Sequence, residues 1–333
     1  MTEAVALVSL SEPLFGLPLA ELWFGLTFLV LGAFLLLDGF DFGVGVLFPT
    51  RDDEREREQL LAAIGPFWDG NEVWLVVFGG ALFATFPAVY ATLFSRNYLL
   101  MFAILGALIV RGLAPEMYEQ RDDPAWHRVW GVAFTAGSAA APFLLGVFVG
   151  NWLTGTGGLS PASVVVGLAV VALSVVSGAA FLGIKTREAL QSDMRRVGPR
   201  AVAAYLALVV AALLLLSTRP HLREGLLGAG ALVPVGLSVV FAGGYAYAAR
   251  EGRFRAAFAA TAGLVLSLVA LVASLLYPVV DPGTGLSVSE AVVSTVPLNV
   301  MTLFAAPLLP LVVVYFVVLY TSFSGPVEAG ETY

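Results

Sequence analysis

Four carboxylates lie inside two strongly apolar stretches of the chain. Asp38 and Asp41 belong to the stretch LLDGFDFGVGVLFP. Asp69 and Glu72 belong to the stretch IGPFWDGNEVWLVVF. In each pair the acids are three positions apart, so on a helix they lie about 60° apart around the axis and share one face. Acids in a hydrocarbon setting persist mostly where they face protein or water, which makes these four candidates for function.

The chemistry that suits such acids is proton exchange, because a carboxyl group among apolar helices can take up and release a proton. Their neighbours fit this role. The indole of Trp68 offers a donor and a wall, Gly70 leaves room for water, and Asn71 can both donate and accept hydrogen bonds. We therefore predict a cytoplasmic proton-uptake path, whose acids and supporting residues are Asp38, Asp41, Asp69, Glu72, Trp68, Asn71 and Arg111.

A purely structural role for the same residues is an open alternative. The acids would then only pair with Arg111, which follows in the next apolar run. Asp69 also has the right chemistry to cap the amino end of the second helix. The structural and the proton-transfer interpretations do not exclude each other.

The composition indicates an integral membrane protein. Of 333 residues, 59% are hydrophobic and 12% are charged, whereas soluble domains are about 25% charged. The chain has no cysteine, which excludes disulfides, thiolate metal sites and haem attachment through cysteine. Its two histidines, His127 and His221, fall in predicted loops, so we expect no metal site and no bis-histidine haem site in this chain alone. Basic nucleic-acid patches and glycine-rich phosphate loops are also absent from the sequence.

The elements that must position these residues are membrane-spanning helices, which need about 18 or more apolar residues each. The sequence predicts about nine of them, at 20–48, 68–94, 98–115, 129–150, 162–184, 201–217, 230–248, 256–278 and 298–321. We expect one membrane domain over 1–333, with a first helix bundle at 20–150, a second helix group at 162–321 and a polar tail at 322–333.

Three further features bear on how the helices pack. Gly32, Gly39 and Gly43 line one side of the first span and predict a close backbone neighbour. The charged segment 185–200 is the expected hinge between two helical groups. Asn299 and Thr302 are expected to pack, or to hydrogen-bond, across helices.

The distribution of basic residues predicts the orientation in the membrane. Most of them follow the odd-numbered spans, and only Arg96, Arg219 and Arg223 follow the even-numbered ones. The positive-inside rule then places the amino terminus outside and the carboxyl terminus in the cytoplasm, with the four acids in the cytoplasmic half. A net charge of −7 with Lys185 as the single lysine suggests a surface adapted to high salt, although GC-rich coding produces the same preference for arginine.

Residues 21–118 resemble subunit II of the cytochrome bd-type quinol oxidases, including the cyanide-insensitive members. The resemblance is carried by LLDGFDFGVGVLFP and by IGPFWDGNEVWLVVFGGALFATFPAVYATLFS. Weaker similarity continues in the Tyr277–Pro278 pair and in the segment LNVMT. By motif match, the acids of the family fall on Asp38, Asp41 and Asp69, with Trp68 beside the last.

The resemblance implies an all-α membrane protein with two four-helix bundles and one peripheral helix. It implies a prokaryotic cell-membrane complex in which subunit I oxidises quinol and reduces dioxygen to water. Haem b and haem d, or haem b alone, would belong to subunit I, and none to this chain. Subunit II would support its partner and contribute carboxylates to proton uptake, with lipid, quinone and a small accessory chain as further expected partners.

Two other functions fit the same residues. A proton-coupled secondary transporter would also need intramembrane acids, although the sequence shows no paired inverted repeat. A structural membrane scaffold would lock every acid in a salt bridge. Co-purification of a haem-bearing partner would favour the oxidase subunit over both.

Overall fold

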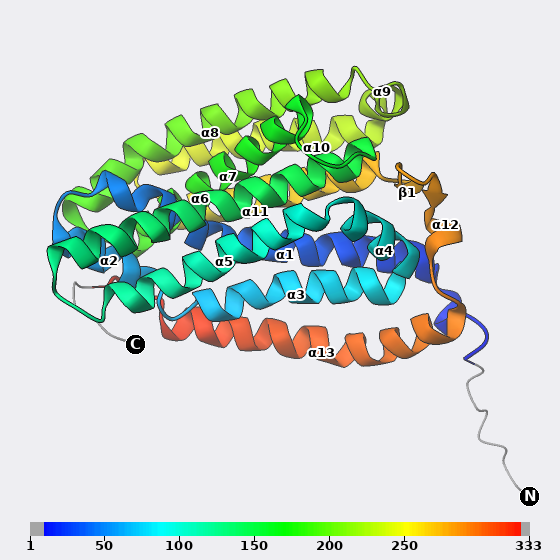
Figure 1. Cartoon of the computed structure of the whole chain (residues 1–333), viewed down its shortest axis with the longest axis horizontal. Helices are drawn as coiled ribbons and strands as arrows, with labels where there is room; N and C mark the ends of the chain where they lie inside the picture. Colours follow the sequence, from blue (N-terminus) through cyan, green and yellow to red (C-terminus); the bar gives the residue numbers. More distant parts are fainter. Residues whose placement is uncertain (1–9, 328–333) are drawn as a thin grey trace, which may run out of the picture.

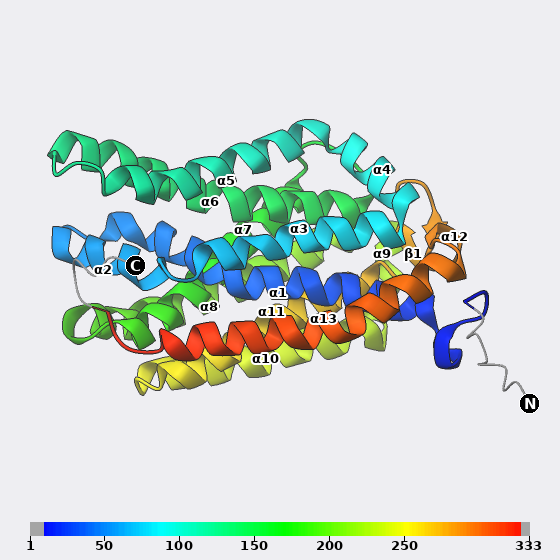
Figure 2. The ribbon, with the colours of Figure 1, turned by 90° about the horizontal axis from the view of Figure 1, so that it is seen from below.

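The computed structural model describes residues 10–327, and most of them are helical. The long helices run side by side along one axis (Figures 1 and 2). Among the described residues, eight helices are long and apolar enough to cross a membrane. The prediction of an all-α integral membrane protein is therefore confirmed.

These eight helices and one shorter helix, Trp68–Thr85, form two groups of four and one peripheral helix among the described residues, as the resemblance implied. About nine spans were predicted; the helix Trp68–Thr85 is the one that is not among the eight. The first group packs around α1 and contains α1 (Leu19–Leu47), α3 (Trp68–Thr85), α5 (Tyr98–Tyr118) and α6 (Pro124–Thr154). The second group contains α7 (Pro161–Lys185), α8 (Glu188–Leu216), α10 (Ala229–Arg250) and α11 (Phe254–Leu275). The two groups meet where α7 packs on α1 and α6, and where α11 packs on α1.

The peripheral helix is α13 (Thr295–Ser322), whose most apolar stretch has no buried residue within the chain. It lies along α3 and α1 (Figures 1 and 2). Near its start, Thr302 Oγ1 accepts a hydrogen bond from Trp23 Nε1 at 3.0 Å, and Asn299 Oδ1 accepts one from the backbone of Leu14 at 3.0 Å. The LNVMT segment thus hydrogen-bonds the last long helix to the beginning of the first.

The glycine stripe brings α1 against α7 at one point. A Cβ added to Gly43 would lie 1.9 Å from the backbone oxygen of Ser174, so only glycine permits this approach. Gly178 of α7 faces the same contact from the other side. Gly39, in contrast, has nothing within 4 Å of an added Cβ. The predicted close approach is therefore centred on Gly43 and does not extend along the whole stripe.

Polar side chains begin several helices in the way that capping chemistry predicts. Asp53 accepts a hydrogen bond from the backbone of Arg55 at the start of α2 (Glu54–Ile64). Asp123 accepts two from the first turn of α6, and Ser160 forms a capping box at the start of α7. Each oxygen satisfies an N–H group that the helix itself leaves without a partner.

Two predicted segments differ from the structure. The predicted span 68–94 is divided into α3 and α4 (Pro87–Arg96), because Pro87 has no N–H to continue the helical ladder. The expected hinge at 185–200 is instead the charged beginning of α8, which is continuous from Glu188. Its charges had suggested a loop, but they lie on a helix that extends past the apolar part of the bundle.

Short elements complete the chain, mostly at the end of the molecule where the amino terminus lies (Figure 1). They are η1 (Leu14–Gly16), η2 (Phe48–Thr50), α9 (Pro220–Leu227), β1 (Val279–Asp281), β2 (Leu286–Ser287) and α12 (Val288–Ala291). β1 and β2 form a small antiparallel hairpin, which lies near α4.

One buried carboxylate fixes that hairpin to α4, and we call its contacts the Asp281 clamp. Asp281 accepts hydrogen bonds from Arg96 Nη1 at 3.1 Å and Nη2 at 3.2 Å. It also accepts bonds from Thr92 at 2.9 Å, Thr284 at 2.8 Å and the backbone of Gly283 at 3.0 Å. Burial alone would raise the pKa of Asp281, but the hydrogen bonds, that from Arg96 foremost, hold the pKa below its ordinary value.

Candidate functional site

Arg111 of α5 is the centre of a buried group of carboxylates, which we call the acid cluster. Its Nη2 atom lies 2.8 Å from Asp38 Oδ1 and 3.5 Å from Asp41 Oδ2. Its Nη1 atom lies 3.3 Å from Glu72 Oε2. The acid cluster therefore consists of Asp38, Asp41, Glu72 and Arg111. The sequence had also grouped Asp69 with these four residues.

Two helices supply the acids. α1 presents Asp38 and Asp41 on one face, and both side chains are 0% exposed. α3 supplies Glu72, whose side chain is 30% exposed. The three-residue spacing in α1 places both aspartates on one face. α1 packs on α3 and α6, and α6 packs on α5, so the carboxylates meet the guanidinium that α5 carries.

A second chain of hydrogen bonds links the acid cluster to the last helix. Asn71 Nδ2 donates to Asp41 Oδ2 at 2.8 Å, and Tyr320 Oη donates to Asn71 Oδ1 at 3.0 Å. Asn71 thus both donates and accepts, as its side chain allows. Tyr320 was not predicted, because no local pattern in the sequence connects α13 to the apolar stretch that contains Asn71.

Aromatic rings cover the guanidinium of Arg111. Its Cζ atom lies 5.1 Å from the ring centre of Phe42 and 5.6 Å from that of Trp68. Both distances allow a favourable cation–π contact. Trp68, which the sequence predicted as a supporting residue beside Asp69, therefore contacts Arg111 of the acid cluster.

The charges and hydrogen bonds of the acid cluster do not balance. Three carboxyl groups face one guanidinium, and Asp38 Oδ2 and Asp41 Oδ1 are buried without a hydrogen-bond partner among the described residues. Buried charges without a partner are costly, and so are buried polar atoms without a hydrogen bond. The arrangement can therefore accept protons, or polar molecules such as water, at these oxygens.

An apolar cavity of about 390 Å³ adjoins the acid cluster. Glu72 is the charged residue in its wall, and the remaining lining comes from apolar and aromatic side chains that include Phe34, Phe78 and Met101. Glu72 thus contacts both this cavity and Nη1 of Arg111, while both aspartates of α1 contact Nη2.

Asp69 is not part of the acid cluster. It lies exposed in the first turn of α3, and its side chain makes no hydrogen bond or ion pair with the residues that the structure describes. It does not cap α3 either, because the N-cap is Phe67, without a side-chain hydrogen bond. The alternative in which Asp69 caps the second helix is therefore wrong. Glu72 lies one turn further into the bundle.

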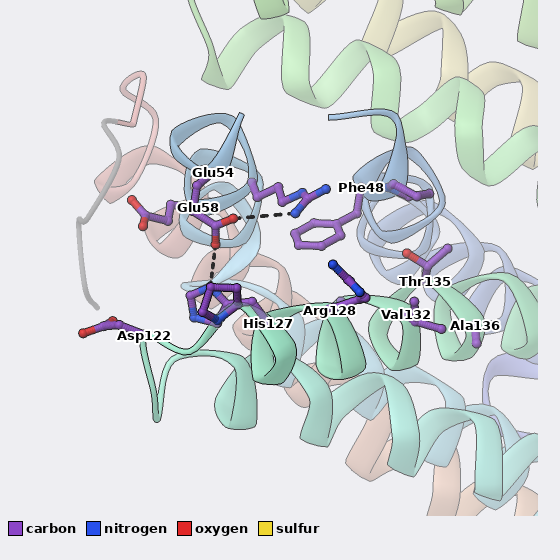
Figure 3. A pocket seen from close by; sticks show the side chains of 13 residues that line it. Phe48, Glu54, Glu58, Asp122, His127, Arg128, Val132, Thr135 and Ala136 are labelled. Carbon is purple, nitrogen blue, oxygen red and sulfur yellow. Dashed lines mark ion pairs between the residues drawn. The ribbon is translucent and has the colours of Figure 1, made fainter. Parts of the chain in front are cut away.

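The histidines have local partners. His127 Nδ1 lies 2.7 Å from Glu54 Oε1, and its ring stacks on Tyr118 with the ring centres 4.2 Å apart. Figure 3 shows His127 and Glu54 in the wall of an open pocket of about 820 Å³, where Glu54 also pairs with Arg57. His221 Nε2 lies 3.3 Å from the backbone oxygen of Leu153. Neither histidine lies beside the acid cluster.

Comparisons with known proteins agree with this architecture. Residues 19–323 match the family model of cytochrome bd terminal oxidase subunit II. Cytochrome bd ubiquinol oxidase subunit 2 of Bacillus subtilis is 31% identical over 89% of this chain and 93% of that protein. Cytochrome bd-I ubiquinol oxidase subunit 2 of Escherichia coli K12 is 35% identical over 58% of this chain.

The matches differ in how much of each relative they cover. The chain spans 55% of the length of the Escherichia coli protein, and 57% of the probable cytochrome oxidase subunit 2 of Haemophilus influenzae, at 35% identity. A bd oxidase structure from Geobacillus thermodenitrificans shares the fold, with a TM-score of 0.77 at 17% identity, over 92% of this chain and 98% of that chain.

The family match covers the acid cluster and both helix groups, and the Bacillus relative extends the similarity over nearly the whole chain. The chain therefore belongs to the cytochrome bd terminal oxidase subunit II family.

Proposed function

We propose that this chain is the non-haem subunit of a membrane quinol oxidase. Its partner would be subunit I, which would bind haem b with haem d, or haem b alone, oxidise quinol and reduce dioxygen to water. The proposal is supported by membership of the subunit II family and by relatives named as ubiquinol oxidase subunits. A small accessory chain and bound quinone or lipid are further expected partners.

The described residues of this chain do not fit a haem. His127 is held between Glu54 and Tyr118, and His221 is exposed beside a backbone oxygen. No step of the oxidase reaction is therefore assigned to a haem within this polypeptide.

We propose that the acid cluster takes up protons for the reaction in the partner. The observation that carries this proposal is the sharing of one buried guanidinium by three carboxyl groups. Asp69, exposed one turn before Glu72, would receive protons from solvent and pass them toward Glu72. The carboxylates of α1 would then hold a proton beside Arg111 until it moves to the partner.

The structural alternative is favoured by the 2.8 Å pair between Arg111 and Asp38, which is a good ion-pair distance. Proton uptake and quinol-driven oxygen consumption in proteoliposomes separate the two roles. We expect Asp38→Asn and Asp69→Asn each to lower both rates roughly tenfold or more, with haem absorbance retained. Asp122→Asn, an exposed loop acid, is the control. Unchanged rates in both variants would leave only the structural role.

A proton-coupled transporter is distinguished by purification. We expect the chain to remain bound to a haem-bearing partner in detergent. A homogeneous haem-free protein that moves a solute would replace the oxidase proposal by the transporter.

We further propose that the amino-terminal end faces outward and the carboxyl-terminal end faces the cytoplasm. α1 begins and α13 ends at opposite ends of the molecule (Figure 1), which agrees with nine crossings if α3 is added to the eight candidate spans among the described residues. The basic residues concentrate at the end that holds the acid cluster and α2, as the positive-inside rule requires. We also propose that the surface of the protein is adapted to high salt. Melting temperatures measured in increasing KCl test this proposal, and no gain in stability at molar KCl would contradict it.

A further inference from the structure

A cavity of about 600 Å³ opens in the second helix group, away from the acid cluster. It lies between the end of α7, the turn that joins α10 to α11, and the segment that follows α13. Figure 2 shows the adjoining ends of α10 and α13 at the same end of the molecule. These are ends of spanning helices, so the cavity lies at the level where a membrane meets water.

Arginines dominate the wall of this cavity. Arg187, Arg253 and Arg255 line it, and no carboxylate does. None of the three forms an ion pair within 4 Å among the described residues, whereas Arg51 and Arg111 are both paired. The wall therefore carries three positive charges that the described part of the chain does not neutralise.

The turn that joins α10 to α11 adds a fourth arginine. Gly252 has φ +72°, a conformation that glycine adopts readily. A Cβ at Gly252 would come within 2.5 Å of Arg195 Nη2, so the guanidinium of Arg195 lies directly against this turn. The absence of a side chain at Gly252 thus lets α8 bring another cation to the rim.

Backbone N–H groups at the start of α11 also favour an anion in this cavity. α11 begins at Phe254, and its N-cap, Arg253, makes no side-chain cap hydrogen bond. The first N–H groups of a helix have no partner within the helix, and they favour an anion. Phe254, Arg255 and Ala256, the first residues of α11, all line the cavity. Guanidinium groups and free backbone N–H groups together form the donor set that binds phosphate oxygens.

We propose that this cavity binds the phosphodiester headgroup of an anionic phospholipid. The position at the ends of spanning helices favours a lipid over a free phosphate. Ile184, Phe254 and Pro326 provide an apolar side to the same cavity, on which the first carbons of the lipid chains can lie. The site is separate from the acid cluster, and its occupancy does not depend on the proposed oxidase function.

The test uses the purified complex, exchanged into a detergent without lipid. Binding of phosphatidylglycerol, phosphatidylcholine and inorganic phosphate is measured by native mass spectrometry and by the shift of melting temperature. The test variant is Arg253→Gln/Arg255→Gln. The matched control is Arg219→Gln/Arg223→Gln, which removes two exposed arginines that belong to another part of the molecule.

We expect the unmodified complex and the control to bind phosphatidylglycerol in preference to phosphatidylcholine. The test variant should lose on the order of tenfold or more in affinity for phosphatidylglycerol, since hydrogen bonds from two charged groups are removed. Equal affinity in the test variant and the control would overturn the site. Inorganic phosphate that binds as tightly as the lipid would overturn the assignment to a lipid headgroup.

Discussion

The acid cluster and the Asp281 clamp are both built from a buried carboxylate and an arginine, but they are completed differently. In the Asp281 clamp, one carboxylate receives bonds from Arg96, two threonines and a backbone N–H. In the acid cluster, three carboxyl groups share Arg111, and two of their oxygens have no described partner. In the Asp281 clamp the carboxylate oxygens all have hydrogen-bond partners, so the site is saturated, which suits a structural link. In the acid cluster two oxygens remain able to accept a proton, which suits proton transfer.

The largest expected effect comes from removing the guanidinium of the acid cluster. Arg111→Met leaves three carboxyl groups without their cation, and breaking a buried pair in this way costs about 3–5 kcal/mol. We expect a strongly lowered melting temperature, or failure of the complex to assemble. Arg223→Met, at an exposed arginine, is the control. Equal melting of the two variants would show that the guanidinium does not hold the acids together.

A smaller loss is expected at the saturated site. Asp281→Asn removes the charge that Arg96 and two threonines recognise, which costs about 1–3 kcal/mol. The melting temperature of the purified complex should fall, while proton uptake should remain. Asp122→Asn, an exposed acid, should leave the melting temperature unchanged. A loss of proton uptake in Asp281→Asn would erase the distinction between the two sites.

The pH dependence of stability tests the role of Asp281 in the clamp. Hydrogen bonds hold the pKa of Asp281 below its ordinary value, so the ionised form is favoured in the folded chain. Its stabilising contribution is complete above about pH 4 and is lost as the pH falls through the lowered pKa. The difference in melting temperature between the unmodified complex and Asp281→Asn should therefore be constant above about pH 4 and narrow below it. A difference that widened on acidification would contradict the assignment.

The smallest effect on stability is expected from neutralising one acid of the cluster. In Asp41→Asn the pair between Arg111 and Asp38 remains, and the new amide oxygen can still accept from Asn71. Because the acids outnumber their cation, we expect the free energy of unfolding to fall by about 1 kcal/mol or less, with a correspondingly small decrease in melting temperature. Destabilisation as large as that of Asp281→Asn would mean that the acid cluster is saturated too.

The sequence predicted the acid cluster wherever local geometry determines it. Asp38 and Asp41 share a helix face through their spacing, and Arg111 was placed at their level by counting spans. Asp69 was grouped with Glu72 by the same spacing, but the depth of α3 in the bundle depends on packing against α1. Asp69 at the end of the bundle and Glu72 inside it are only one helical turn apart. No pattern in the sequence shows which of the two acids lies inside.

Long-range contacts were beyond prediction for a similar reason. Asp281 lies in the β1–β2 hairpin, yet its partner Arg96 lies 185 positions earlier in the chain. The charged residues of 185–200 suggested a loop, because composition does not distinguish a solvated helix from a hinge. The order of the long helices followed from hydropathy, but the predicted span 68–94 did not, because Pro87 divides that apolar run into α3 and α4 and α3 is not among the eight candidate spans.

The hydrogen bond from Tyr320 to Asn71 has a consequence for biosynthesis, since 249 positions separate the two residues. During translation, α1, α3 and α5 leave the ribosome long before α13 does. Until the last helix is made, the amide oxygen of Asn71 lacks the hydrogen bond from Tyr320. The order of synthesis therefore delays completion of the hydrogen-bond chain from Asp41 through Asn71 to α13 until the nascent chain is almost finished.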